Sequence, residues 1–379
     1  MPDYLGRDTS NNTTSAAVFD SSTGCVVHKK KLLPVAEGAL GLKQSDAVFA
    51  HVKQLPQILE ELFFAVPQAQ NQLAAVGVSV RPRNAQDSYM PCFLTGRLAA
   101  DAISATNGIP LYPFSHQCGH IAAALYSAQQ LRLIGSEFVA FHFSGGTTEC
   151  VQVGADDQWV FDTKLLYHSL DLKCGQAVDR VGGMLGLPFP AGMQLDRLAQ
   201  QADKQFKVKL TFKDGNCCVS GVQNQCEQLL AKGESRENVA RFCIDSVCAV
   251  VKRMTENVRE CCPNLPLLYS GGVMSNSIIR RFGAVRRLLC KAGVFLGQRR
   301  RHCYPCRGDG GALADILAFP SSAAMLTCST AIPCLDCCCV GNFQLCLSPA
   351  QRALLFHPQG GRLRGAGGHV QPLCKRPAV

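Results

Sequence analysis

The sequence lacks the features that direct a chain into or across a membrane. No apolar run approaches the roughly 20 residues that a membrane helix needs. Residues 1–4 have neither the basic nor the apolar region of a signal peptide. We therefore expect a soluble, cytoplasmic protein with no membrane partner.

Charged residues are also few, at 17% of the chain, whereas 47% of the residues are hydrophobic. This composition excludes disorder as the overall state and allows a large buried core. A length of 379 residues favours two domains or one two-lobed enzyme. In a cytoplasmic protein, the 22 cysteines are expected to be reduced thiols and not a disulfide framework.

The C-terminal part, residues 298–379, lacks glutamate altogether and has only three aspartates. It nevertheless holds 9 of the 22 cysteines and 9 of the 38 lysines and arginines. After Pro320 no sustained periodicity is found, and the end is rich in Gly, Pro, Arg and Cys. We therefore separate this irregular tail from residues 1–297.

Residues 1–297 alternate strand and helix patterns in two similar halves. Each half has a strand, a Ser/Thr-rich turn, two more strands and then helices. We expect one lobe at residues 1–132 and a second at 133–297, which together form a two-lobed α/β fold around a nucleotide. Among the expected helices are 46–65, with a kink or boundary at Pro56, and 116–131.

Two histidines four residues apart form the first chemical motif. His116 and His120 would share one face of a helix, so that both imidazoles could bind one metal ion. The alternative is two unrelated histidines near a helix start. No glutamate stands beside His116, so the zinc-protease pattern is not met.

A glycine-rich turn follows a predicted strand at residues 144–148. Its backbone N–H groups and hydroxyls could hold a phosphate, although an ordinary hairpin turn would use the same residues. Residues 8–14 form a polar turn at the equivalent place in the first half. Its first residues, Asp8, Thr9 and Ser10, are candidates for substrate or nucleotide binding.

Three further positions could contact a nucleotide. The Gly271-Gly272 turn leads to Asn276 and suits either a base and ribose or a tight strand–helix connection. Asp179 could bind ribose hydroxyls, or it could simply favour the first turns of a helix. Gly192 ends a rigid Pro/Gly loop, and such loops often line sites.

Together and in this order, the motifs resemble those of the tRNA adenosine threonylcarbamoyltransferase family, also labelled glycoproteases or O-sialoglycoprotein endopeptidases. The resemblance extends from residue 4 to about 297 and is strongest to a divergent bacterial branch, through residues 8–15 and 88–94. It implies a duplicated actin-like ATPase fold, which sugar kinases and heat-shock ATPases share.

The resemblance also implies roles for individual residues. It places a metal on His116 and His120, with Asp309 as the nearest match to the third ligand. Asp179 would bind the adenosine ribose, and Gly192 and Asn276 would lie near the nucleotide. The remaining substrate and phosphate contacts would come from Ser144, Gly145, Gly146, Thr147 and Thr148.

The implied reaction transfers a threonylcarbamoyl group from an adenylate to an adenosine beside the tRNA anticodon. The implied cofactors are one divalent metal, iron or zinc, and an adenylate or ATP-type nucleotide with magnesium. Expected partners are tRNA, threonylcarbamoyl-adenylate, a paralogous actin-like protein and a small ATPase. Two rival interpretations are a non-catalytic paralogue that acts as a dimerisation partner and a metalloendopeptidase.

The chain departs from the family pattern at several positions. An acidic pair is replaced by Asn12 and Thr13, the loop histidine by Thr147, and a glutamate by Gln176. Arg7 stands where an apolar strand residue is expected. The composition break also motivates a hypothesis that the coding frame slips near Gly297, which would make Asp309 a coincidence. The coding DNA tests this, because an alternative frame should encode a family-like tail.

Overall fold

The computed structural model describes residues 2–34, 42–157 and 160–281, all of which belong to one compact unit. Asp309, the tail at 298–379 and the proposed frame slip lie outside these residues. Within the described part of the chain, no helix is long and apolar enough to cross a membrane. All twelve cysteines described are free thiols, as predicted for these positions.

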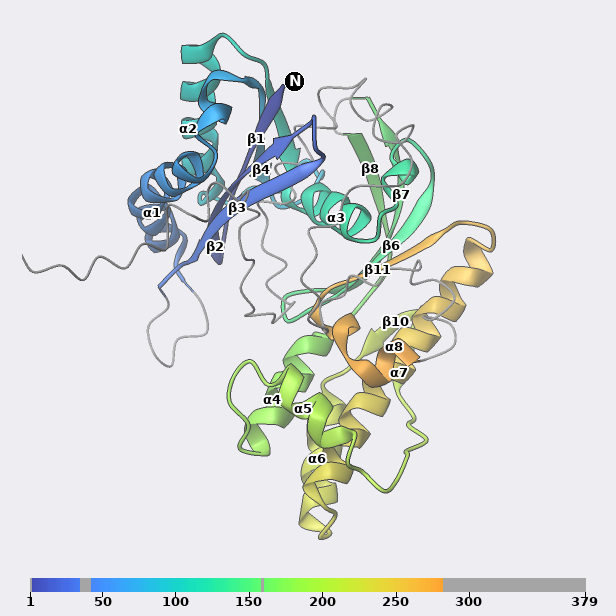
Figure 1. The fold of residues 1–379 in the computed structure, drawn as a ribbon. Coiled ribbons are helices and arrows are strands. Elements are labelled where there is room, and N and C mark those ends of the chain that lie inside the picture. The colour runs from blue at the N-terminus through green and yellow to red at the C-terminus, as the bar shows by residue number, and fades with distance from the viewer. Residues whose placement is uncertain (1, 35–41, 158–159, 282–379) are drawn as a thin grey trace, which may run out of the picture. The chain divides into compact units, whose positions relative to one another are not determined.

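The first sheet has five strands in the order β3-β2-β1-β4-β5 (Figure 1). β1 pairs antiparallel with β2, β2 antiparallel with β3, and β4 and β5 run parallel to β1. The prediction missed β5, which contains Pro113. The strands are β1 (Asp3–Ser10), β2 (Thr13–Asp20), β3 (Cys25–Leu32), β4 (Leu73–Arg81) and β5 (Leu111–Ser115).

Alternation along β1 directs its side chains to two different sets of helices. Leu5 packs in a core with α1 (Gln44–Ala65), and Thr9 bonds to the start of α2 (Phe93–Asn107). Tyr4 lies on the opposite face, in a core with α3 (His116–Ser127). Period-two alternation therefore places Asp8 on the α3 side, and this geometry builds the site.

Two helix predictions need correction. α1 is continuous through Pro56, so the predicted boundary there is wrong; buried residues on both sides of the proline, such as Leu55 and Ile58, keep the apolar face of the helix in the core. α3 ends at Ser127 and not at residue 131, and Gln129 then adopts a left-handed conformation with φ 54°. α2 stops at Gly108, which is a left-handed C-cap.

The second sheet repeats the strand order of the first. Its order is β11-β6-β7-β8, in which β7 pairs antiparallel with β6 and with β8, and β11 pairs parallel with β6. Counted along the chain, the second sheet has the order 3-2-1-4, which matches the first four strands of the first sheet, and this repeat confirms the predicted duplicated actin-like fold. The strands are β6 (Phe138–Phe143), β7 (Thr148–Asp156), β8 (Val160–His168) and β11 (Leu267–Ser270).

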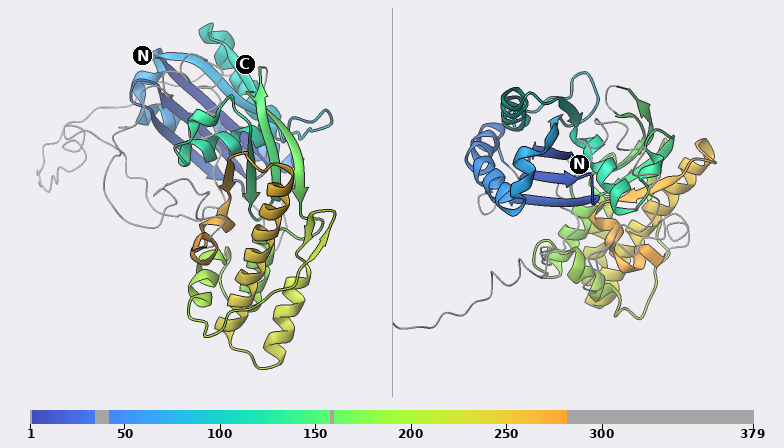
Figure 2. Two further views of the ribbon diagram at one scale, coloured as in Figure 1. Left: turned by 90° about the vertical axis from the view of Figure 1, so that its right-hand side faces the viewer. Right: turned by 45° about the horizontal axis from the view of Figure 1, so that its top comes forward.

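Helices of the second half form a large core with β6. Val139, Phe141 and Phe143 pack against them, and Figure 2 shows these helices gathered together below the sheet. The 26-residue α7 contributes more of the buried side chains of this core than any other element. The remaining elements are α4 (Cys174–Met184), α5 (Gly192–Ala199), β9 (Thr211–Lys213), β10 (Asn216–Cys218), α6 (Gly221–Ala231), α7 (Arg236–Cys261), η3 (Gly272–Ser275) and α8 (Ser277–Arg281), with η1 (Pro67–Asn71) and η2 (Leu131–Leu133) in the first half.

α3 connects the two halves. Its buried face packs on Tyr4 and Ala75 of the first sheet and on Phe138 and Ala140 of the second, in a single hydrophobic cluster. The helix begins at His116 because the Ser115 hydroxyl accepts a hydrogen bond from the Cys118 N–H, at 3.2 Å. Along the sequence, all strands of the first sheet come before residue 132 and all strands of the second sheet come after residue 133. The exact domain boundaries stay a prediction.

Candidate functional site

A cavity of about 220 Å³ lies where α3 meets the second sheet. Its polar lining includes His116, His120, His142, Thr147, Glu149 and Ser270. A larger hollow, of about 490 Å³, lies at the end of α1, but its lining is mainly apolar and brings no chemical groups together. The cavity on α3 is therefore the candidate site.

The two predicted histidines meet in this cavity. The Nε2 atoms of His116 and His120 are 2.9 Å apart, and the ring centroids are separated by 4.4 Å. Two imidazole nitrogens that each lie about 2.0–2.1 Å from one ion have a similar separation, about 3 Å. The prediction that both imidazoles share one face of a helix is confirmed, and their nitrogens converge.

Asp8 holds His116 in the orientation that exposes its Nε2 atom. The carboxylate is fully buried, and its Oδ2 atom accepts a hydrogen bond from His116 Nδ1 at 2.9 Å. Burial alone would raise the pKa of Asp8, but the charge of His116 and hydrogen bonds from His116, Ser79 and Ser10 outweigh it and lower the pKa. Asp8 is therefore an anionic partner that fixes the imidazole.

His120 is held in its neutral form. Desolvation by burial is the largest cause that lowers its pKa well below the usual range, and the nearby charges of His116 and His142 act in the same direction. A neutral imidazole retains the lone pair that a metal ion requires. Within the described ranges, no group of three or more His, Cys, Asp or Glu side chains is already arranged to hold a metal ion.

His142 is a cavity residue that the sequence interpretation missed. Its ring centroid lies 5.0 Å from that of His120, although 22 residues separate them in the sequence. One sequence signal was present, because His142 is the only polar residue of the otherwise apolar strand β6 and stands two positions before the glycine loop. That spacing puts it on the same sheet face as the loop's first residue.

Glu149 connects the two halves at the cavity, and it was also not predicted. Its Oε2 atom accepts from Arg83 Nη2 at 2.7 Å, and its Oε1 atom accepts from Gln117 Nε2 at 2.9 Å. Gln117 lies on α3 between the two histidines. Glu149 is 7% exposed, so this pairing satisfies a buried carboxylate and fixes the wall of the cavity.

The glycine turn at residues 144–148 connects β6 to β7 and closes on itself. Ser144 N–H donates to the Thr147 carbonyl at 2.7 Å, and Thr147 N–H donates to Ser144 Oγ at 3.0 Å. Thr148 Oγ1 accepts from Cys174 N–H. At Gly146 nothing lies within 4 Å of the place that a Cβ atom would occupy, which leaves room at the tip.

The start of α4 packs directly on this turn. A Cβ atom on Gly175 would lie 2.5 Å from the Gly145 nitrogen and 2.6 Å from the Ser144 carbonyl carbon, so only glycine fits. Gln176 Oε1 accepts from the Lys173 N–H at 3.2 Å and so pairs a backbone donor at the start of the helix. The helix terminus and the glycine turn therefore form one rigid unit, and glutamine serves there in place of the family's glutamate.

The turn between β1 and β2 is fixed mainly by internal bonds. Thr9 Oγ1 donates to the Cys92 carbonyl and accepts from Gly96 N–H, which attaches β1 to α2. The Ser10 carbonyl accepts from the buried His51. The Thr9 hydroxyl therefore makes structural hydrogen bonds to residues at the start of α2. A nucleotide contact for this turn stays a prediction.

The predicted nucleotide residues lie around α4, α5 and α8. Asp179 Oδ1 accepts from Ala191 N–H at 2.8 Å and so holds the Pro/Gly loop that leads to Gly192. Asn276 Oδ1 accepts from the N–H groups of Ile278 and Ile279 and caps α8. Gly271 has φ +97°, and a Cβ atom there would meet the Phe143 carbonyl oxygen at 2.1 Å.

Comparison with known proteins identifies the family. Residues 37–290, about two thirds of the chain, match the family described as tRNA N6-adenosine threonylcarbamoyltransferase. The enzyme of that name from Bacillus licheniformis is 27% identical over 286 residues, which cover 73% of this chain and 80% of the relative. The one from Streptococcus pneumoniae is 28% identical over 242 residues, or 61% and 67% of the two chains.

Among solved structures, full-length HypF in its phosphate- and nucleotide-bound form superposes with a TM-score of 0.49 and 11% identity, over 86% of this chain and 55% of HypF. The family match covers well over half of the sequence. This chain belongs to the tRNA N6-adenosine threonylcarbamoyltransferase family.

Proposed function

We propose that this chain transfers a threonylcarbamoyl group from threonylcarbamoyl-adenylate to the exocyclic amine of an adenosine beside the tRNA anticodon. The amine nitrogen attacks the carbamoyl carbon, the bond from that carbon to the AMP oxygen breaks, and the amine loses one proton. The observation that supports the proposal is that two converging imidazoles and a glycine turn line the same part of the structure. Family membership supplies the reaction class.

The residues present fit a divalent metal, which we take to be iron or zinc. His116 and His120 would hold it, since their Nε2 atoms face each other and Asp8 orients the first of them as metal-bound histidines require. Asp309 is the third ligand proposed from the sequence. The metal would act as a Lewis acid that polarises the carbamoyl group and as a template that orients the donor.

Asp8→Asn is expected to weaken metal binding by about 10- to 100-fold, because loss of a carboxylate partner makes a ligating imidazole less basic. Equilibrium dialysis against Zn²⁺ measures this directly. Asp46→Asn, on the first turn of α1, is a control that should bind like the wild type. Equal affinities for Asp8→Asn and the wild type would contradict the orienting role of Asp8.

The glycine turn would stabilise negative charge that develops on the carbamoyl and phosphate oxygens. Thr147 lines the cavity beside the histidines, and the open tip at Gly146 lets an anion approach the backbone. Ser144 and Thr148 shape the turn through the hydrogen bonds described above, and Gly145 packs against the start of α4. The interlocked start of α4 holds this arrangement in place before the substrate binds.

For the adenylate, we propose that Asp179 contacts the ribose, while Gly192 and Asn276 lie near the nucleotide. Asp179 and Asn276 each use one oxygen within the fold, which fixes their side chains at α4 and α8. Asp8, Thr9 and Ser10 would form the phosphate-side turn of the first half. An ATP-type nucleotide with magnesium is the proposed second cofactor.

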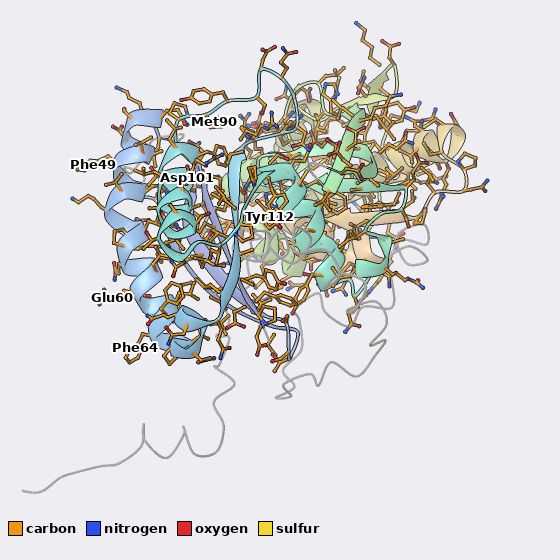
Figure 3. All side chains as sticks on the ribbon, turned by 90° about the horizontal axis from the view of Figure 1, so that it is seen from above. Phe49, Glu60, Phe64, Met90, Asp101 and Tyr112 are labelled. Carbon is orange, nitrogen blue, oxygen red and sulfur yellow. The ribbon has the colours of Figure 1, made fainter. Side chains whose placement is uncertain are left out.

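We further propose that the protein works in the cytoplasm with tRNA, a paralogous actin-like partner and a small ATPase. The outer sides of α1 and α2 support a partner surface, because Phe49, Val52, Leu94 and Leu98 are 53–72% exposed. Figure 3 shows Phe49 on the outer side of α1. Exposed apolar side chains on neighbouring helices are typical of protein interaction sites.

Leu98→Glu is expected to weaken association with the actin-like partner strongly, since it places a charge in the middle of an apolar contact. We expect binding to fall at least about tenfold by analytical ultracentrifugation, as for a well-buried interface residue. Leu170→Glu, at an exposed leucine of the second half, is the matched control. Undiminished association of the Leu98→Glu protein would remove this surface from consideration.

Incubation of the metal-loaded protein with threonylcarbamoyl-adenylate, its partners and tRNA tests the function. We expect threonylcarbamoyladenosine in the digested tRNA. No product from a correctly folded sample would overturn the transferase assignment and favour a non-catalytic paralogue. Cleavage of a peptide substrate would favour the metalloendopeptidase, for which no general-base glutamate adjoins His116.

A further inference from the structure

His142 projects into the same cavity as the two predicted metal ligands. Along β6, Phe141 and Phe143 pack into the core of the second half, whereas Phe138 and Ala140 belong to the core around α3. Alternation places His142 on the side of Ala140, where both residues line the cavity with His116 and His120. The fold thus adds an imidazole from a strand to the pair on the helix.

The hydrogen bonds of Ser270 determine the tautomer of His142. The Ser270 hydroxyl donates its single proton to the Phe141 carbonyl, at 2.9 Å. It can therefore only accept from His142 Nδ1, which lies 3.0 Å away, so that Nδ1 carries the proton and Nε2 the lone pair. His116 is held in the same way, because its Nδ1–H group donates to Asp8 Oδ2. Ligating histidines normally donate their other N–H group to such a partner.

The spacing of the rings also suits one shared ion. The centroids of His116 and His120 are 4.4 Å apart, and those of His120 and His142 are 5.0 Å apart. Imidazoles that share an ion through bonds of about 2.0–2.1 Å have centroids roughly 4.5–5 Å apart. Since the three imidazoles are not yet arranged to hold an ion, the His142 ring would have to move toward His116 and His120 when the ion binds.

We infer that His142 is a protein ligand of the metal that we propose on His116 and His120, so that α3 and β6 together supply three imidazoles. The inference rests on the proposed function only for the presence of the metal. It gives the chain a third ligand that does not depend on Asp309. Three neutral ligands leave the ion its full positive charge, which strengthens its attraction for carbonyl and carboxylate oxygens.

Metal titration of the full-length, metal-stripped protein tests the inference without any activity assay. Zn²⁺ affinity and the visible spectrum of the Co²⁺ form are compared for the wild type, His142→Ala and His28→Ala, a control on the edge strand β3. We expect one ion per chain, at least about tenfold weaker binding by His142→Ala, and a changed cobalt spectrum. His28→Ala should match the wild type.

A second variant tests whether weaker binding by His142→Ala could come from a folding defect. Ser270→Ala keeps the imidazole but removes the acceptor of its Nδ1 proton, and it should weaken binding by a smaller factor. Wild-type affinity and an unchanged cobalt spectrum in His142→Ala would overturn the inference. Loss of the metal in Asp309→Asn but not in His142→Ala would overturn it as well. If His120→Ala also binds like the wild type, the metal assignment itself fails, which separates the two outcomes.

Discussion

His120→Ala is expected to reduce threonylcarbamoyl transfer by about 10³-fold. A Lewis-acid metal contributes several kcal/mol to such a reaction, and each 1.4 kcal/mol corresponds to a factor of about ten. The substitution removes one of the two nitrogens that converge at 2.9 Å in the cavity. The rate of formation of the modified nucleoside under single-turnover conditions measures the effect.

His116→Ala should cause a similar loss, and the double variant should be little worse than either single one, because the two imidazoles act as a unit. His28→Ala, outside the cavity, should retain normal transfer. Thermal unfolding of the metal-free proteins should be alike, which excludes misfolding as the cause. Activity of His120→Ala within about threefold of the wild type would show that the histidine pair does not serve the reaction.

Gly175→Ala is expected to destabilise the protein by about 1–3 kcal/mol, as inserted methyl groups do in tightly packed sites, and to eliminate transfer. The added Cβ atom would collide with backbone atoms of Ser144 and Gly145, which cannot rotate away as a side chain could. The start of α4 must then separate from the glycine turn. Chemical denaturation and the nucleoside assay report the two effects.

Gly183→Ala provides the matched control on the same helix, because nothing lies within 4 Å of its Cβ position. At an exposed helical position, alanine should stabilise the protein by about 0.5–1 kcal/mol relative to glycine. Transfer should be unaffected. If Gly175→Ala proved as stable and as active as Gly183→Ala, the contact between α4 and the turn would not be required for function.

Local patterns predicted the elements and the histidine pair well. The four-residue spacing of His116 and His120 and the Ser115 cap lie within a single helix, so that no long-range contact was needed to place them. The duplicated strand order followed from two copies of the same local pattern. The helix boundary offered at Pro56 was wrong, because burial of α1 against the sheet outweighs the local effect of proline.

Contacts between distant residues could not be predicted in the same way. Asp8 and His116 are 108 residues apart, and their bond depends on which face of β1 meets α3. His142 and Ser270 are 128 residues apart and meet only because β11 pairs in parallel with β6. In both cases the residue itself is visible in the sequence, but its partner can be identified only once the packing and register of the sheet are known.

The most direct test of the proposed transfer measures both products of the donor, AMP and the transferred carbamoyl group, in one reaction. Threonylcarbamoyl-adenylate labelled in its carbamoyl carbon is incubated with tRNA, the partner proteins and the metal-loaded chain, and AMP and labelled nucleosides are quantified. We expect equal amounts of AMP and of adenosine labelled beside the anticodon, and neither product above background with His120→Ala. AMP without labelled tRNA, or labelled tRNA that does not depend on His120, would contradict it.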